Sequence, residues 1–329
     1  MDPRRVAWLA VLLLVAGPAS ALAASCTTQA QLQPQDRSAL AAIGQRLTTA
    51  VLQQDYATLQ ANLLPAVSGQ WDGMHNEVDL GAQVVKGGQP QLQSIYLMDA
   101  SSQTAASDTQ FFCSNATGTL TVTINMHALP PGRYALILAN AAGSALGGQI
   151  GLIVVWDSTG AAPAWKLGGV SVRQGSIGGH DGVWYWSQAR SSAIAGNTWG
   201  AWYTYDLAHY LLLPVDFLSS PNMEKLEHEQ AQLQPQPGPF PLHLQDGDRT
   251  WTIQGIRIDT TLRTADLAVT YESLGIADPA AARTEAMAVL GALLRAHPEL
   301  RNGFHGLWAL ASKDGKVTPV IELTMDQIH

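Results

Sequence analysis

The sequence contains few charged residues and almost no cysteine. Asp, Glu, Lys and Arg make up 13% of its 329 residues, and cysteine occurs twice. Two cysteines are too few for a zinc ribbon or a disulfide-rich scaffold. The formal net charge is −8, and no basic run is longer than Arg4-Arg5, so the composition argues against a nucleic-acid-binding protein. Hydrophobic residues reach 47%, which is enough to build a core, and the length predicts roughly two or three domains.

Short motifs of common catalytic sites are also missing. The sequence has no G-x-S-x-G, no H-E-x-x-H, no Walker A motif, no dinucleotide-binding G-x-G-x-x-G and no EF-hand loop. Beyond the N-terminus, no uninterrupted apolar stretch approaches about 18 residues, so we expect no transmembrane helix in the mature chain. We expect no cofactor and no metal ion, and a binding protein is favoured over an enzyme.

Residues 1–25 have the features of a secretory signal peptide. Arg4 and Arg5 form a basic start, and an apolar stretch runs from Val6 to Val15. Gly17-Pro18 breaks this stretch, and small residues follow. This order predicts export, to the periplasm or out of the cell.

Two processing routes compete for Cys26. An A-x-A site at Ala21–Ala23 would leave Cys26 free to form a disulfide with Cys113. Residues 22–26 instead resemble a bacterial lipobox, in which Cys26 becomes the lipidated first residue and anchors the protein to a membrane. The even number of cysteines favours the Cys26–Cys113 disulfide.

The spacing of hydrophobic residues changes along the chain from a helical to a strand-like period, which predicts an α+β protein with several parts. After the signal peptide we expect an N-terminal α+β domain (26–180), a helical segment (181–233), a proline-rich linker (234–241) and a C-terminal α+β domain (242–329). In the first domain, Leu40, Ile43, Leu47 and Val51 mark one face of a helix. An antiparallel sheet should follow, with strands at Leu92–Met98, Leu120–Met126, Tyr134–Ala139, Ile150–Trp156 and Trp165–Val172.

The later parts show clear boundaries for helices and strands. Val183–Ile194 and Thr198–Leu213 suit two helices of a hairpin, and Ser220 can cap a third helix. The C-terminal domain follows a small β-β-α-β-β pattern, with strands at Trp251–Ile258, Leu267–Glu272, Leu307–Ala311 and Val317–Leu323 and a helix from Pro279 to Ala296, capped by Asp278.

The best catalytic candidates are His180 and Asp181, in the glycine-rich stretch 178–182. A histidine beside a carboxylate can act as a general base. The structural alternative is a tight turn in which Asp181 caps the helix that contains Trp184. A deep pocket around His180 would favour an enzyme, and a surface turn would favour a binding protein.

Aromatic residues concentrate in the central segment. Trp184, Trp186, Trp199 and Trp202 are four of the ten tryptophans and fall within 19 residues. Exposed rings of this kind bind peptides or carbohydrates. Their helical spacing places most of them in a core, so we expect one or two exposed rings.

Two further polar sites are better explained by structure than by metal binding or catalysis. Glu224, Glu227 and His228 lie on one helix face at ligand-like spacing, but charged runs of this kind are normally solvated, so no metal site is predicted. His305 sits at a helix-to-strand turn, where a structural role is favoured.

Three resemblances add to this picture. The runs Trp156–Gly160 and Trp165–Val170 resemble the last hairpin of NTF2-like domains, which implies a curved sheet with an internal pocket. The central segment resembles one tetratricopeptide (TPR-like) hairpin at Trp184, Ala189, Gly196, Ala201, Tyr205, Ala208 and Pro214. Residues 111–113, 179–186 and 304–308 are similar to an uncharacterised family of secreted bacterial proteins.

Together these observations predict an exported, non-catalytic binding or assembly protein of the bacterial cell envelope, with a protein, peptide or glycan partner. The alternatives are an exported hydrolase that uses His180 and Asp181, or a carbohydrate-binding module that uses aromatic residues between Trp184 and Tyr210.

Overall fold

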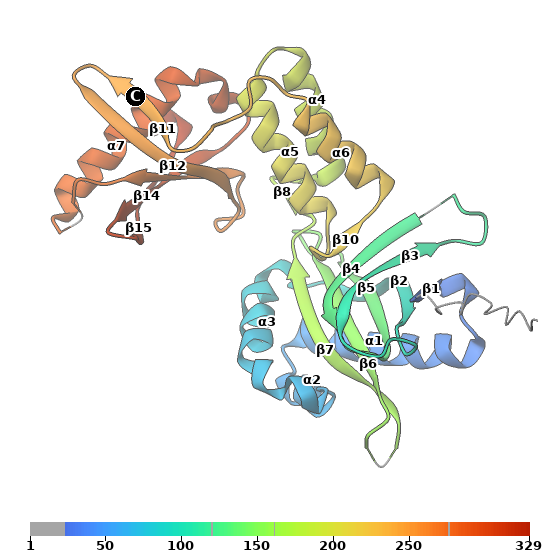
Figure 1. Ribbon diagram of the computed structural model, residues 1–329. Coiled ribbons are helices and arrows are strands. Elements are labelled where there is room, and N and C mark those ends of the chain that lie inside the picture. Colours follow the sequence, from blue (N-terminus) through green and yellow to red (C-terminus); the bar gives the residue numbers. More distant parts are fainter. Residues whose placement is uncertain (1–23, 120, 161, 276) are drawn as a thin grey trace, which may run out of the picture.

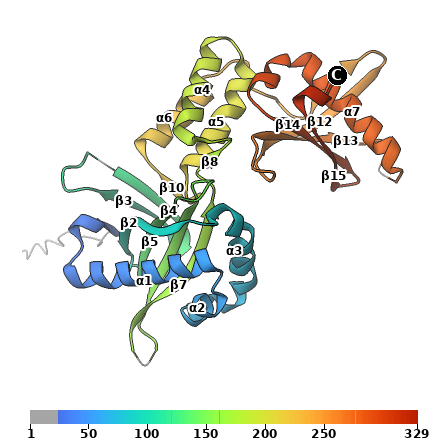
Figure 2. The ribbon, with the colours of Figure 1, turned by 180° about the vertical axis from the view of Figure 1, so that it is seen from behind.

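The computed structural model describes residues 24–119, 121–160, 162–275 and 277–329, and it confirms the α+β class (Figure 1). The basic and apolar parts of the predicted signal peptide lie outside the described residues. Figures 1 and 2 show helices α4–α6 between an N-terminal and a C-terminal sheet. None of the helices in the described ranges combines the length and the hydropathy that a membrane crossing needs.

The N-terminal sheet is antiparallel and five-stranded, in the order β1-β2-β5-β6-β7. Its strands are β1 (Ser25–Thr28), β2 (Gln89–Asp99), β5 (Arg133–Ala142), β6 (Gln149–Asp157) and β7 (Ala164–Arg173). Helices α1 (Pro34–Gln53), α2 (Tyr56–Ala61) and α3 (Trp71–Val85) precede the long strands, with short 3-10 turns η1 (Gln29–Gln31) and η2 (Pro65–Gln70). The predicted α1 face is confirmed, because Leu40, Ile43, Leu47 and Val51 are all buried in the core against this sheet.

A smaller sheet packs on the face of the N-terminal sheet away from α1. It has the order β10-β4-β3 and contains β3 (Ser107–Ser114), β4 (Thr121–Leu129) and β10 (Leu218–Ser219). Phe111 and Ile124 of this sheet meet Met98 and Leu136 of the larger one in a second core. Leu120, the predicted start of β4, lies outside the described residues.

The predicted disulfide is present in the structure. Cys26 on β1 is bonded to Cys113 on β3, so the bond ties the edge of the large sheet to the small one. A sulfur in a disulfide cannot also form the thioether that the lipobox alternative requires.

The central helices form an antiparallel hairpin with a third helix beside it. They are α4 (Gly182–Ile194), α5 (Thr198–Leu212) and α6 (Pro221–Ala231), and a short hairpin of β8 (Ser176–Ile177) and β9 (His180–Asp181) leads into them. The predicted N-caps are confirmed for α4 and α6, because Asp181 accepts from the Trp184 amide and Ser220 from the Met223 amide.

The C-terminal sheet has one strand more than the predicted β-β-α-β-β pattern. Its order is β11-β12-β13-β14-β15, with β13 and β14 parallel and the other neighbours antiparallel. The elements are β11 (Leu242–Asp246), β12 (Arg249–Asp259), β13 (Asp266–Glu272), α7 (Pro279–Ala296), η3 (Pro298–Asn302), β14 (Gly306–Lys313), β15 (Lys316–Thr324) and η4 (Met325–Gln327). The added strand β11 is short and begins directly after Pro241, and a turn at Gly247-Asp248 joins it to β12.

The central helices and the C-terminal sheet share one continuous hydrophobic core. Tyr203 and Leu207 of α5 belong to the same buried cluster as Trp251 of β12 and Leu293 of α7. Tyr203 and Leu207 lie on the side of α5 opposite the TPR-like pattern positions Ala201, Tyr205 and Ala208, so α5 contributes to this core from a second side.

Candidate functional site

His180 and Asp181 lie in a surface turn. Gly178 and Gly179 have φ values of +57° and +81°, which glycine adopts without strain, and they bring the chain from β8 into β9. The His180 ring is exposed and stacks on Trp184, with ring centroids 3.7 Å apart. Asp181 Oδ1 accepts a 2.9 Å hydrogen bond from the Trp184 amide. This geometry matches the helix-cap alternative.

The four tryptophans have different surroundings. Trp184 is 38% exposed, whereas Trp199 is 5% exposed and stacks on His297 at 3.5 Å. Trp202 and Trp186 are half-buried. Trp199 is thus closed to a ligand, and Trp184 presents the most open ring of the four.

Trp186 takes part in a polar cluster that sequence reasoning missed. Its indole N–H donates to Glu229 of α6 over 2.8 Å, and Arg190 of α4 makes a two-pronged contact with the same carboxylate at 2.7 and 2.8 Å. Tyr205 of α5 also donates to Glu229, over 3.3 Å. The Arg190 guanidinium lowers the pKa of Glu229, and burial raises the pKa of Tyr205 to about 12. The cluster joins three helices, so we assign these residues to the scaffold.

The charged face of α6 does not form a metal group in the described residues. Glu227 pairs with His209 of α5 at 3.0 Å, and His228 contacts Gln232 at 2.7 Å. Glu224 is exposed. The face instead helps to hold α6 on α5.

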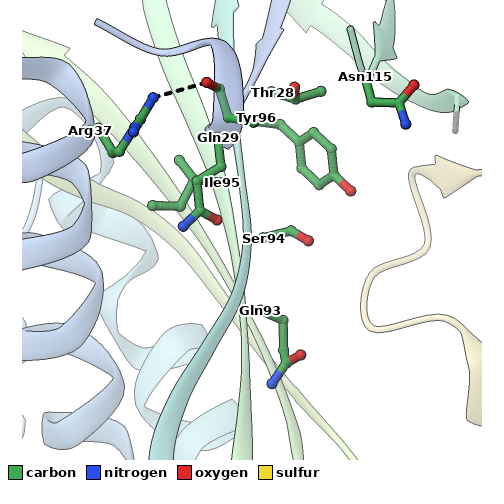
Figure 3. A pocket seen from close by; sticks show the side chains of 9 residues that line it. Thr28, Gln29, Arg37, Gln93, Ser94, Ile95, Tyr96 and Asn115 are labelled. Carbon is green, nitrogen blue, oxygen red and sulfur yellow. Dashed lines mark hydrogen bonds between the residues drawn. The ribbon is translucent and has the colours of Figure 1, made fainter. Parts of the chain in front are cut away.

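A pocket of about 420 Å³ lies at the outer edge of β2 (Figure 3). It is lined by Thr28, Gln29, Ala30, Arg37, Gln93, Ser94, Ile95, Tyr96 and Asn115. These residues come from β1, η1, α1, β2 and the end of β3, so the pocket forms where the first strand leaves the sheet. In Figure 3, Ser94 and Tyr96 point toward the side of Asn115, and Ile95 points toward α1.

The pocket exists because β1 covers only part of β2. The four residues of β1 pair with Tyr96–Asp99, whereas β2 extends back to Gln89. In the described residues, Gln89–Leu92, Ser94 and Ile95 pair with β5 on one side, and Gln93 forms a bulge. No strand pairs with Gln89–Ile95 on the other side within this part of the chain. The opposite edge of the sheet is bridged at one residue, because Leu64 N donates to Leu167 O on β7 and Leu167 N donates to Asn62 O.

Arg37 and η1 determine where β1 ends. Arg37 Nη2 donates to the carbonyl oxygens of Ala30 and Leu32 at 2.9 and 3.0 Å. Thr28 Oγ1 donates to Gln31 Oε1 at 2.8 Å. These bonds bend the chain toward α1 directly after Thr28 and leave the next part of β2 open.

The pocket is suited to hydrogen bonding and not to acid–base chemistry. Gln93, Ser94 and Thr28 contribute amide and hydroxyl groups to its lining, and the side chains of Ile95 and Tyr96 are buried. No carboxylate, histidine or cysteine is among its lining residues in the described part of the chain. The alternating Gln-rich stretch 89–94 is a sequence signal for an edge strand, but its lack of a partner follows only from the register.

Comparison of the chain with protein-family models, with curated proteins and with solved structures finds no match. The resemblances to NTF2-like domains, to a TPR-like hairpin and to secreted bacterial proteins therefore stay predictions.

Proposed function

We propose that this protein is an exported binding or assembly protein of the cell envelope, and that it takes an extended segment of a partner protein along the outer edge of β2. The observation that carries the proposal is the row of β2 residues from Gln89 to Ile95, which has no strand partner on its outer side within the part of the chain that the structure describes. The disulfide between Cys26 and Cys113 supports export, because such bonds persist in oxidising compartments.

A peptide in this position would continue the line of β1. Strand β1 pairs antiparallel with β2 and ends at Thr28, opposite Tyr96. The next residues of an added strand would lie opposite Ile95, Ser94 and Gln93. Main-chain groups would supply the hydrogen bonds, and the pocket would receive alternate side chains of the peptide.

The side chains at the pocket indicate the chemistry of the partner. Gln93 and Ser94 offer neutral donors and acceptors, and the lining residue Arg37 already donates to two backbone carbonyls, so a polar, uncharged segment fits best. Net gains of about 0.5–1.5 kcal/mol per hydrogen bond predict weak binding for a short segment. Higher affinity would need contacts outside the pocket.

The exposed His180–Trp184 pair supports a glycan as the second candidate partner. Sugars bind to exposed indole rings, and Trp184 is the most open of the four tryptophans. The hydrolase alternative receives no such support, since Asp181 is engaged as a helix cap.

Selection from a random twelve-residue peptide library displayed on phage tests the proposal. The purified, disulfide-bonded protein is the target, and enriched peptides are then mapped by hydrogen–deuterium exchange. We expect protection of the amides of residues 91–96. Protection confined to α4–α6 or to the C-terminal sheet would contradict the proposed site.

A pair of variants gives the control. Ser94→Trp places a large side chain in the pocket and should abolish binding of the enriched peptides. Ser187→Trp adds the same side chain to an exposed position on α4 and should leave peptide binding unchanged. Circular dichroism of both variants checks that they fold. Equal binding by Ser94→Trp and the wild type would refute the β2 edge as the site.

A further inference from the structure

Three potential metal ligands from distant parts of the chain meet at one end of the C-terminal sheet. Asp266 is the first residue of β13, His305 directly precedes β14, and Glu322 lies on β15. One ligand atom from each lies within 4.8 Å of the others. Sequence analysis gave His305 a structural role, and the three residues share no short motif because they become neighbours only through strand pairing.

The register explains how the two carboxylates meet. Asp266 pairs with Gly306, and Glu322 pairs with Trp308, two residues further along β14. Since alternate residues share a face, the two acidic side chains lie on the same face on either side of β14. Gly306 leaves the space between them open. A Cβ atom there would lie 2.9 Å from Glu322 Oε1 and 2.5 Å from the Leu323 carbonyl oxygen.

Among the described residues, both oxygens of Asp266 have hydrogen-bond partners, whereas Glu322 has one oxygen without a partner. Asp266 is completely buried and accepts from Thr264 Oγ1 at 2.6 Å, and His305 Nδ1 lies 3.1 Å from its other oxygen. Glu322 Oε1 is buried and has no hydrogen-bond partner among the described residues. A buried, unpartnered carboxylate oxygen next to a second carboxylate is costly unless a cation lies between them. His305 supplies a positive charge only when it is protonated.

We propose that Asp266, His305 and Glu322 bind one divalent transition-metal ion, with Zn²⁺ preferred over Mn²⁺. Two carboxylates neutralise a dication, and the imidazole nitrogen selects for transition metals over Ca²⁺ and Mg²⁺, which prefer oxygen ligands. Zn²⁺ binds such a mixed donor set more tightly than Mn²⁺ in the general affinity order. The His305 side chain is 46% exposed, which gives the ion a route from solvent.

The inferred site would keep at least one coordination position for water. Three protein ligands and a water are typical of catalytic zinc sites, whereas structural zinc sites use four protein ligands. This site lies on the C-terminal sheet, whereas the pocket lies at β2, and it does not depend on the proposed peptide-binding function.

The test is isothermal titration of the tag-free, EDTA-treated full chain with Zn²⁺, and separately with Mn²⁺ and Mg²⁺. We expect one Zn²⁺ per chain, weaker Mn²⁺ binding and no Mg²⁺ binding at equal concentration. Glu322→Gln and His305→Gln should each weaken Zn²⁺ binding by about a hundred-fold. Loss of a group that only orients a metal ligand already costs about ten- to a hundred-fold, and loss of a ligand itself should reach the upper end of that range. Replacement by Co²⁺ should give visible absorption bands that change in His305→Gln.

Controls distinguish this site from adventitious binding by the chain's other histidines. His243→Gln removes an exposed histidine from β11 of the same sheet and should leave the affinity unchanged. Thermal melts without metal check folding, and His305→Gln is the informative variant if Glu322→Gln is unstable, because its side chain is partly exposed. Zn²⁺ binding that is unaffected by His305→Gln, or equally weakened by His243→Gln, would overturn the proposal.

Discussion

Removal of the Cys26–Cys113 disulfide should destabilise the N-terminal sheets strongly. The bond joins residues 87 positions apart, and the entropy of closing such a loop works out at about 4.6 kcal/mol at 25 °C. Denatured chains are not fully expanded, so we expect a smaller loss of about 2–5 kcal/mol. The variant Cys26→Ser/Cys113→Ala suits the surroundings, because Cys113 is 1% exposed in an apolar core and Cys26 is partly exposed.

The measurement is equilibrium unfolding in urea, with hydrogen–deuterium exchange as the probe. Exchange in peptides of β2 and β5 reports the unfolding of the N-terminal sheet separately from that of the C-terminal sheet. Wild-type protein in dithiothreitol should match the double variant, and dithiothreitol should not affect the variant further. A loss below about 1 kcal/mol in the N-terminal peptides would refute the loop-entropy argument. An equal loss in β12 and β13 would show that the bond does not act locally.

Two further predictions concern the central helices and their contact with η3. Ala208 is fully buried where α4 begins beside α5, so Ala208→Leu should overpack the contact between the two helices. In a urea melt, the free energy of unfolding should fall by about 1–3 kcal/mol. The control Ala195→Leu, at an exposed position, should change it by no more than about 0.5 kcal/mol. Burial lowers the pKa of His297, which stacks on Trp199, below its ordinary value of 6.5. The stabilising contribution of neutral His297 is therefore complete above pH 6.5 and is lost as the pH falls through the lowered pKa. Between about pH 7.5 and pH 5, the melting temperature should fall less in His297→Gln than in the wild type. Equal pH dependence in both proteins would contradict this assignment.

Helix starts were predictable from the sequence because capping is local. Asp55, Asp181, Ser220 and Asp278 each accept a hydrogen bond from a backbone amide two or three residues later. Each is a preferred cap residue, and Asp181 and Asp278 precede helices whose ranges were expected within a few residues.

The missed elements depend on partners that are distant in the sequence. Helix α3 places Met74, Val78, Gly81 and Val85 on its buried side, and Gly81 belongs to this side only because the helix lies directly on β7. A Cβ atom at Gly81 would come within 2.3 Å of Val172. Strand β3 alternates weakly and is defined by its pairing with β4 and its disulfide.

The candidate sites were even less accessible to sequence reasoning, because both are products of register. Gln93 and Ser94 are unremarkable polar residues until β1 stops short of them, and Asp266 and Glu322 become neighbours only across Gly306. Motif searches look for ligands close together in the chain, and neither arrangement has that form.

The disulfide and Arg37 have complementary effects on the same strand. The bond at Cys26 keeps β1 on the edge of the sheet, so the four paired residues of β1 are fixed at one end. Arg37 holds the carbonyl of Ala30 against α1, so the chain cannot continue along β2 beyond Thr28. Without the bond, a strand of four residues would hold the edge weakly, and without the turn, the chain itself could extend along the open part of β2. Exposed sheet edges are usually covered or shortened, because they attract other strands. In this sheet, the β7 edge is bridged at Leu167, whereas β1 covers only one end of the β2 edge. The uncovered part of β2 keeps the geometry that an added strand requires.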